Sequence, residues 1–213
     1  MLQAPAELAP YRSFCARVGS ELTWVQGPGG NASLKDHELL WIKASGTWLS
    51  QAEAETIFVP VELAAVQAQI ARGDDTPLAP LPGWKLRPSL ETTLHGLLPQ
   101  RYVLHIHSIA ALTWAVRADA EACFARRLAG KLPFCYVPYA RPGAKLTAAT
   151  RDALQRGACD YLVLGNHGVL LGAETIAQLH ALLLRSEALL APQTTATEHA
   201  AAYIIVATRS RSS

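Results

Sequence analysis

Charged side chains are scarce in this chain of 213 residues, at 17% where a soluble domain commonly has about a quarter. Half of the residues are hydrophobic, so we expect much of the surface to be buried within the chain or against copies of it. The formal net charge is only +2, and no run of basic residues occurs along the chain. Nucleic acid is therefore excluded as the main partner, because binding its phosphates normally needs a concentrated basic stripe.

The sequence also lacks an uninterrupted run of about 18 apolar residues, so no membrane span is expected. The first ten residues contain prolines and an acid in place of the basic and apolar segments of a secretory signal. The four cysteines are scattered and form no Cys-x-x-Cys pair, which predicts reduced thiols in a cytoplasmic protein. The length fits a single domain over residues 1–213, with residues 208–213 as a disordered tail.

Hydrophobic periodicity predicts a chain in which helices alternate with short strands. The expected helices cover residues 7–19, 62–72, 89–98, 109–117, 120–127, 146–157 and 174–191. The expected strands cover residues 33–35, 39–43, 58–61, 102–105, 134–137, 161–164 and 169–171. Residues 203–206 fit either a helix or a strand.

Two histidines, His105 and His107, lie two residues apart at the end of the strand expected from Tyr102. Side chains alternate along an extended strand, so both imidazoles point to the same face. From there both rings can reach one cation at about 2.0–2.1 Å. Ordinary packed or surface histidines show the same spacing, so the pair alone leaves both interpretations open.

Two loops of small residues stand next to predicted strands. The first, Gly-Pro-Gly-Gly-Asn-Ala-Ser, contains Gly30 and Asn31, and the second, Ala-Ser-Gly-Thr, contains Ser45 and Gly46. Glycine lets the backbone approach a ligand closely and expose several N–H groups, which suits an anion such as phosphate. Each loop would also serve as a plain turn, but two such loops together favour anion binding.

The segment from Arg87 predicts a helix that Ser89 caps, with Leu90 on its apolar face. Glu91 then lies in the first turn, where it either interacts with the helix dipole or points into a site as a carboxylate. His95 follows on the same side of the helix, and we expect it to be a packed, hydrogen-bonded histidine.

His167 occupies the Gly-Asn-His-Gly turn between two expected strands. A histidine that buried strands hold at the tip of a hairpin is less easily explained as a residue that only packs in the core. Tyr139 and Arg141 lie in the loop after the strand expected at residues 134–137. Each could contribute its polar end to a site or simply pack at the surface.

Taken in order, Gly-Gly-Asn-Ala-Ser, Ala-Ser-Gly-Thr, Pro-Ser-x-Glu-x-x-x-His, His-Ile-His and Asn-His-Gly resemble the motifs of the class II aldolase/adducin family. The resemblance covers residues 11–191 and is strongest to the aldolase half of bifunctional rhamnulose-phosphate aldolase/dehydrogenases. It implies a three-layer α/β/α fold around a mostly antiparallel sheet, usually assembled as a homotetramer. It also implies a divalent metal, usually Zn²⁺, with Mn²⁺ or Co²⁺ as alternatives.

The resemblance further implies roles for individual residues. His105, His107 and His167 match metal ligands, and Glu91 matches a carboxylate that acts as acid/base and closes the metal shell. The positions that match those holding the substrate phosphate are Gly30, Asn31, Ser45, Gly46 and Ser89. Tyr139 is the candidate for a tyrosine that the family takes from a neighbouring subunit.

One departure from the family pattern is Leu90. The sugar-phosphate aldolases often have a second serine at this position, before the glutamate. Leucine removes that hydroxyl donor, so phosphate as the bound group stays an open question.

The motifs together predict a metal-dependent aldolase that cleaves or forms a C–C bond in a small sugar or sugar phosphate through a metal-stabilised enediolate. An epimerase, dehydratase or decarboxylase acting on a sugar phosphate or sugar acid would use the same residues. A non-catalytic adducin-like scaffold is the third hypothesis, and the intact set of histidines with Glu91 argues against it.

Overall fold

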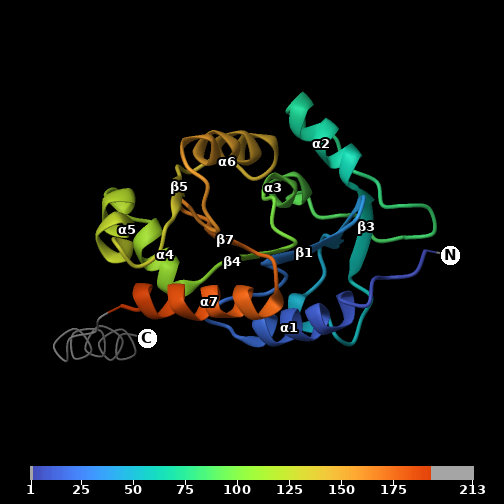
Figure 1. Ribbon diagram of the computed structural model, residues 1–213, viewed down its shortest axis with the longest axis horizontal. Helices are drawn as coiled ribbons and strands as arrows, with labels where there is room; N and C mark the ends of the chain where they lie inside the picture. The colour runs from blue at the N-terminus through green and yellow to red at the C-terminus, as the bar shows by residue number, and fades with distance from the viewer. Residues whose placement is uncertain (1, 193–213) are drawn as a thin grey trace, which may run out of the picture.

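Seven strands form one mixed sheet in the computed structural model, which describes residues 2–192 (Figure 1). The strands are β1 (Asn31–Asp36), β2 (Leu39–Lys43), β3 (Phe58–Glu62), β4 (Tyr102–Ile106), β5 (Cys135–Val137), β6 (Tyr161–Leu164) and β7 (Gly168–Ala173). Their order across the sheet is β3-β2-β1-β4-β7-β6-β5. Neighbouring strands are antiparallel except β5 and β6, which a helix connects as a crossover.

Helices cover both faces of this sheet. They are α1 (Leu8–Ser20), α2 (Leu63–Arg72), α3 (Thr92–Leu97), α4 (Ile109–Ala115), α5 (Ala120–Leu128), α6 (Ala144–Arg156) and α7 (Ile176–Leu190), with a short 3-10 helix, η1 (Leu49–Gln51). In Figure 1, α1 and α7 lie along one face, with α4 and α5 beside α7, whereas α2, α3 and α6 lie along the other. The three-layer α/β/α fold with a mostly antiparallel sheet is therefore confirmed.

Strand β4 is the centre of the sheet and carries the first histidine. Its residues alternate between the two cores: Leu104 and Ile106 pack toward α1 and α7, and Val103 packs toward α3 and α6. Since alternate residues share a face, His105 emerges with Val103 on the α3 side. Register fixes this direction, because β4 is paired on both sides, with β1 and with β7.

Helix α3 begins later than the sequence predicts. Its first residue is Thr92, with Glu91 at the N-cap position, so the expected helix start at Ser89 is wrong. Residues Pro88 and Ser89 instead bridge to the end of β2, where Ser89 N donates to the Lys43 carbonyl at 3.3 Å. As a result, Leu90 is 64% exposed and does not join the apolar face of a helix.

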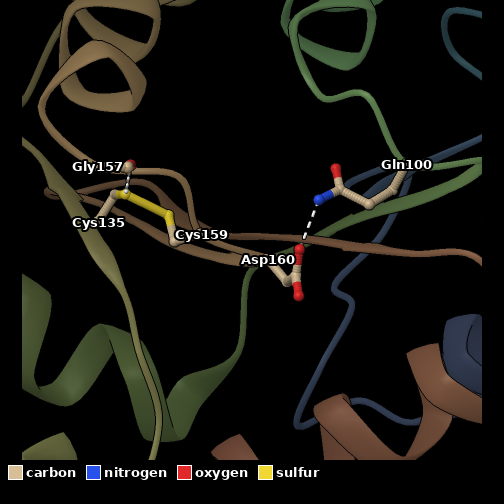
Figure 2. The surroundings of a disulfide bond; sticks show 5 residues. All are labelled: Gln100, Cys135, Gly157, Cys159 and Asp160. Carbon is tan, nitrogen blue, oxygen red and sulfur yellow. Dashed lines mark hydrogen bonds between the residues drawn. A yellow bond between two sulfur atoms is a disulfide. The ribbon is translucent and has the colours of Figure 1, made fainter.

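The expectation of reduced thiols is wrong for one pair. Cys135 in β5 and Cys159 just before β6 form a disulfide (Figure 2), whereas Cys15 and Cys123 are free and buried. Parallel pairing of β5 with β6 brings the two Cα atoms to 6.1 Å, within the range that a disulfide spans. The bond closes the β5–α6–β6 crossover at the edge of the sheet.

None of the helices within residues 2–192 is both long and apolar enough to cross a membrane. The segment 203–206 and the tail 208–213, for which the sequence suggests a helix or strand and disorder respectively, lie outside the described residues.

Candidate metal centre and its surroundings

Three histidines from two parts of the chain meet at one end of β4. His105 is in β4, His107 lies just beyond it, and His167 is in the turn between β6 and β7. One ring nitrogen from each lies within 4.8 Å of the others, and the Nε2 atoms of His105 and His107 are 3.2 Å apart. Three nitrogens at this spacing can converge on one cation and leave a coordination position open for a substrate.

Hydrogen bonds orient two of these residues. Nδ1 of His105 lies 2.9 Å from the Val169 carbonyl, to which it donates, so Nε2 is left free on the side of the other rings. The backbone N–H of His107 donates to the Trp24 carbonyl at 3.0 Å. The ring of His167 has a buried Nδ1 that finds no partner within the described part of the chain.

Two glycines leave room for the rings. A Cβ at Gly168 would collide with the Ile106 carbonyl and lie 3.1 Å from Cδ2 of His107. A Cβ at Gly29 would lie 3.0 Å from Nδ1 of His107. The glycines that flank the site are therefore needed for close packing around the histidines.

Burial keeps the three imidazoles neutral. Loss of surrounding water is the largest cause, and it lowers the pKa of His105 to about 3 and that of His167 to about 4. Repulsion from neighbouring imidazoles lowers both pKa values further, and the pKa of His107 is lowered by burial as well. Neutral rings have the free lone pair that metal binding requires, so at neutral pH no proton has to leave first.

Glu91 faces the histidines from the N-terminus of α3. Its Oε1 lies 3.4 Å from Nε2 of His167 and 3.7 Å from Nε2 of His105. The carboxylate is mostly buried, with 14% of the side chain exposed. The sequence allows Glu91 either to interact with the helix dipole or to point into a site. Its distances to His105 and His167 favour the second interpretation.

The two small-residue loops lie beside this cluster. Asn31 pairs in register with His105 across β1 and β4, and its Nδ2 donates to Ser89 Oγ at 2.5 Å. Ser89 Oγ also accepts the backbone N–H of Glu91 at 3.2 Å. Gly30 packs against the His105 carbonyl, with a Cβ position 3.3 Å away. The first loop is thus joined to β4, and Ser89 is linked to that strand through Asn31.

The second loop is more open. Ser45 and Gly46 are exposed, and Gly46 has a φ of 77° with open space where a Cβ would stand. Ser45 N donates to the Arg87 carbonyl at 2.9 Å, which places the loop next to the segment carrying Ser89. Tyr139, in the loop after β5, is 64% exposed.

Lys43 is a charged neighbour that the sequence reasoning missed. Lys43 is the last residue of β2 and stands immediately before Ala44 and Ser45. Although its side chain is charged, the residue is only 3% exposed. Nζ donates to the Pro28 carbonyl at 3.4 Å. Burial lowers the pKa of this amine to about 8, while the nearby Glu91 carboxylate acts to raise it. A lysine at the end of a buried strand, directly before a loop of small residues, was the available signal.

His95 is packed and hydrogen-bonded, as the sequence predicts. It is fully buried, and its Nδ1 lies 2.8 Å from Ser33 Oγ. Burial lowers its pKa well below the ordinary value. It lies in α3 and is not one of the three histidines that could share an ion.

Residues 13–194 match the family model described as Class II Aldolase and Adducin N-terminal domain. The chain belongs to the class II aldolase and adducin family. This match covers most of the chain and confirms the resemblance that the ordered motifs suggest. Members of the family are typically enzymes and generally depend on a divalent metal, and the three-histidine cluster could bind one.

A curated relative is the Bacillus subtilis (strain 168) protein named Uncharacterized oxidoreductase YuxG, which is 30% identical over 177 residues. The similarity covers 74% of this chain and 25% of YuxG, so the chain spans about a quarter of that protein's length.

Solved structures of class II aldolases share the fold. The N-terminal class II aldolase domain of a conserved Thermoplasma acidophilum protein has a TM-score of 0.75 at 22% identity, covering 89% of this chain and 94% of that one. L-fuculose-1-phosphate aldolase from Thermus thermophilus has a TM-score of 0.58 at 18% identity, covering 87% and 92%. At these identities the likeness is one of fold.

Proposed function

We propose that the protein is a divalent-metal-dependent aldolase that cleaves or forms a C–C bond in a small sugar or sugar phosphate. The observation that carries this proposal is the convergence of three histidine nitrogens within 4.8 Å, with Glu91 Oε1 3.4 Å and 3.7 Å from two of the rings. Membership of the class II aldolase family supports it. The Thermus relative, named an L-fuculose-1-phosphate aldolase, adds support for a sugar-phosphate substrate.

The ligands His105, His107 and His167 would hold the ion, with Glu91 closing the shell until a substrate arrives. Imidazole nitrogens with one carboxylate suit Zn²⁺, and they also accept Mn²⁺ or Co²⁺. A bound ion of this kind supplies Lewis-acid stabilisation of the negative charge that develops when the C–C bond breaks, worth several kcal/mol.

Glu91 is the residue placed to move the proton. Its Oε1 lies beside the histidine cluster, so a hydroxyl or carbon acid held by the ion would be within its reach. Lys43 lies nearby, and the charge of the Glu91 carboxylate acts to raise the pKa of this buried amine against the larger effect of burial. In the cleavage direction Glu91 would take the hydroxyl proton of the leaving aldehyde half, and in the forming direction it would return that proton.

The far end of the substrate needs an anchor that keeps the reacting atoms aligned. The residues proposed for this role are Gly30, Asn31, Ser45, Gly46 and Ser89. The Asn31–Ser89 hydrogen bond links this anchor to the backbone of Glu91, so the two parts of the site are held together. Tyr139 is proposed as a proton donor that a neighbouring copy provides in a cytoplasmic homotetramer.

The test is a screen of the zinc-loaded protein against ketoses, ketose phosphates and sugar acids, with products identified by mass spectrometry and NMR. Release of an aldehyde and a ketone, lost in Glu91→Gln, would support the aldolase proposal. Full activity in Glu91→Gln would remove this residue from the mechanism. Isomerised, dehydrated or decarboxylated products would replace the aldolase reaction with one of those chemistries, and failure to bind metal would favour a scaffold.

A further inference from the structure

The disulfide between Cys135 and Cys159 is a feature that the proposed function does not use (Figure 2). Both residues are partly exposed, so a dithiol in solution can reach the bond, whereas the free thiols of Cys15 and Cys123 are buried. Sγ of Cys135 lies 3.0 Å from the Gly157 carbonyl oxygen, which can accept a hydrogen bond from the Cys135 thiol after reduction. The surroundings therefore suit both the bonded and the reduced state.

The bond closes one end of a short pair of parallel strands. Cys135 is the first residue of β5, and Cys159 lies just before β6, which begins at Tyr161. Strand β5 has three residues and lies at the edge of the sheet, with β6 as its neighbour. So short an edge strand has few backbone hydrogen bonds, which makes local opening inexpensive in free energy. The covalent link to Cys159 limits that opening.

The two ends of the disulfide are held unequally. Asp160 follows Cys159, and its carbonyl accepts the backbone N–H of Gly172 in β7 at 2.8 Å. Its Oδ1 also accepts from Gln100 Nε2 at 2.5 Å, as Figure 2 shows. Cys159 is therefore tied to interior strands of the sheet, and Cys135 is the partner that moves when the bond opens.

The opposite end of the strand pair supports the turn that carries a candidate metal ligand. The carbonyl of Val137, the last residue of β5, accepts the backbone N–H of Gly165 at 2.8 Å. A Cβ at Gly165 would lie 2.9 Å from Tyr136 Oη, so β5 packs directly against this turn. His167 follows in the same turn and offers a ring nitrogen to the histidine cluster. Displacement of β5 therefore acts first on His167, since the other two histidines lie on β4 or just beyond it.

We propose that the Cys135–Cys159 disulfide is a redox-sensitive switch that sets the affinity of the histidine cluster for its metal ion. With the bond closed, β5 is held against the His167 turn and the third nitrogen keeps its place. With the bond open, β5 separates more often and the turn moves with it. The inference rests on the proposed function, because it takes His167 as a ligand of the ion.

The opening step is a thiol–disulfide exchange with a dithiol in solution. The S–S bond of the protein breaks, and Cys135 and Cys159 each become a thiol. The dithiol supplies the two protons and two electrons and is itself oxidised to a disulfide.

The experiment measures zinc affinity of the full chain by competition with a chromophoric chelator. Oxidised chain is compared with chain reduced by dithiothreitol, which is removed without air before the titration. Reduction should weaken zinc binding roughly ten- to hundredfold, as loss of the support behind a metal ligand does. Free thiolates can bind zinc themselves, so the decisive variant combines Cys135→Ser with Cys159→Ser. It should show the weakened affinity with or without reductant.

Two controls separate this coupling from general effects. Cys123→Ser removes a free thiol in α5 and should keep both the zinc affinity and its response to reduction. Leu8→Ala truncates a buried side chain in α1, so it lowers stability while leaving β5 intact, and it should keep wild-type zinc affinity. In the metal-free chain, the Gly165 amide should exchange roughly tenfold or more faster in the double serine variant and at the wild-type rate in Leu8→Ala.

Equal zinc affinity in the oxidised, reduced and double serine chains would overturn the inference. Weakened binding in Leu8→Ala would overturn it too, because affinity would then follow general stability. Free thiols at Cys135 and Cys159 in the air-oxidised chain would have the same consequence. Redox-dependent zinc affinity without turnover of any sugar candidate would sink the proposed reaction and leave this inference standing, and turnover without redox dependence would do the reverse.

Discussion

Nε2 of His167 lies 3.4 Å from Oε1 of Glu91, although the two residues come from a hairpin turn and a helix start far apart in the chain. The same oxygen is 3.7 Å from Nε2 of His105. One carboxylate oxygen thus lies next to two rings of the histidine cluster. In the proposed function the imidazoles hold the metal and the carboxylate moves the proton.

Substitution should separate the two roles. His167→Gln should reduce the zinc bound per chain from about one to a small fraction, because two nitrogens hold an ion much less firmly than three. Glu91→Gln should keep zinc while turnover falls about 10²–10⁴-fold. Elemental analysis after dialysis measures the metal, and Glu62→Gln at the exposed end of β3 is the control. Full zinc occupancy in His167→Gln would contradict the assignment of this ligand.

Gly168→Ala should disturb the metal centre through packing alone. The added methyl would overlap the Ile106 carbonyl, so β4 or the His167 turn must move. We expect a destabilisation of about 1–3 kcal/mol together with weaker zinc binding. Gly157→Ala, where no atom lies within 4 Å of the new methyl, is the matched control. Equal melting temperatures and zinc affinities for the two variants would contradict the packing argument.

Acid should destabilise the metal-free protein through its buried histidines. The folded-state pKa of His95 lies well below 6.5, mainly because burial removes water, so the ring stays neutral in the fold and takes up a proton on unfolding. This contribution to stability is complete above about pH 6.5 and declines as pH falls, by about 1.4 kcal/mol per unit for each such group. Urea unfolding from pH 7 to pH 5 measures the slope, and His95→Gln should lessen it. An unchanged slope would rule out His95 as a source.

Glu187 should matter for zinc although it lies on α7. Its two oxygens accept hydrogen bonds from Ser108 Oγ at 2.6 Å and from Trp24 Nε1 at 3.1 Å. Ser108 follows His107 in the chain, and the Trp24 carbonyl accepts the backbone N–H of His107. Glu187→Ala leaves both donors unpaired, so we expect a loss of about 2–3 kcal/mol of stability and weaker zinc binding. Glu38→Ala in the exposed β1–β2 turn should change neither property. Zinc affinity equal to that of the wild type would limit Glu187 to a structural role.

The disulfide should contribute to stability under oxidising conditions. Cys135 and Cys159 are 24 residues apart, and closing a loop of that length stabilises a fold by about 3 kcal/mol. Cys135→Ser should lower the unfolding free energy by about that amount, and a reducing agent should have the same effect on the wild type. Thiol titration of the native, oxidised chain checks the pairing, since reaction of both cysteines would show that the bond is absent.

The sequence predicts most strands and helices of this fold because their apolar residues follow regular periods. It also singles out His105, His107 and His167, because two lie on one face of a strand and the third lies between glycines. The later start of α3 escapes such reasoning, because it depends on Ser89 bridging to Lys43 in a distant strand. Burial of Lys43 escapes it for the same reason, since local patterns do not show which segments cover a side chain.

The central place of β4 has a further consequence. Backbone hydrogen bonds hold this strand on both sides, to β1 and to β7, and edge strands shield it in each direction. Opening it would require separating the sheet, so its amide protons should exchange with solvent at the rate of global unfolding. The imidazole that this strand carries would then keep its place through every partial opening of the molecule.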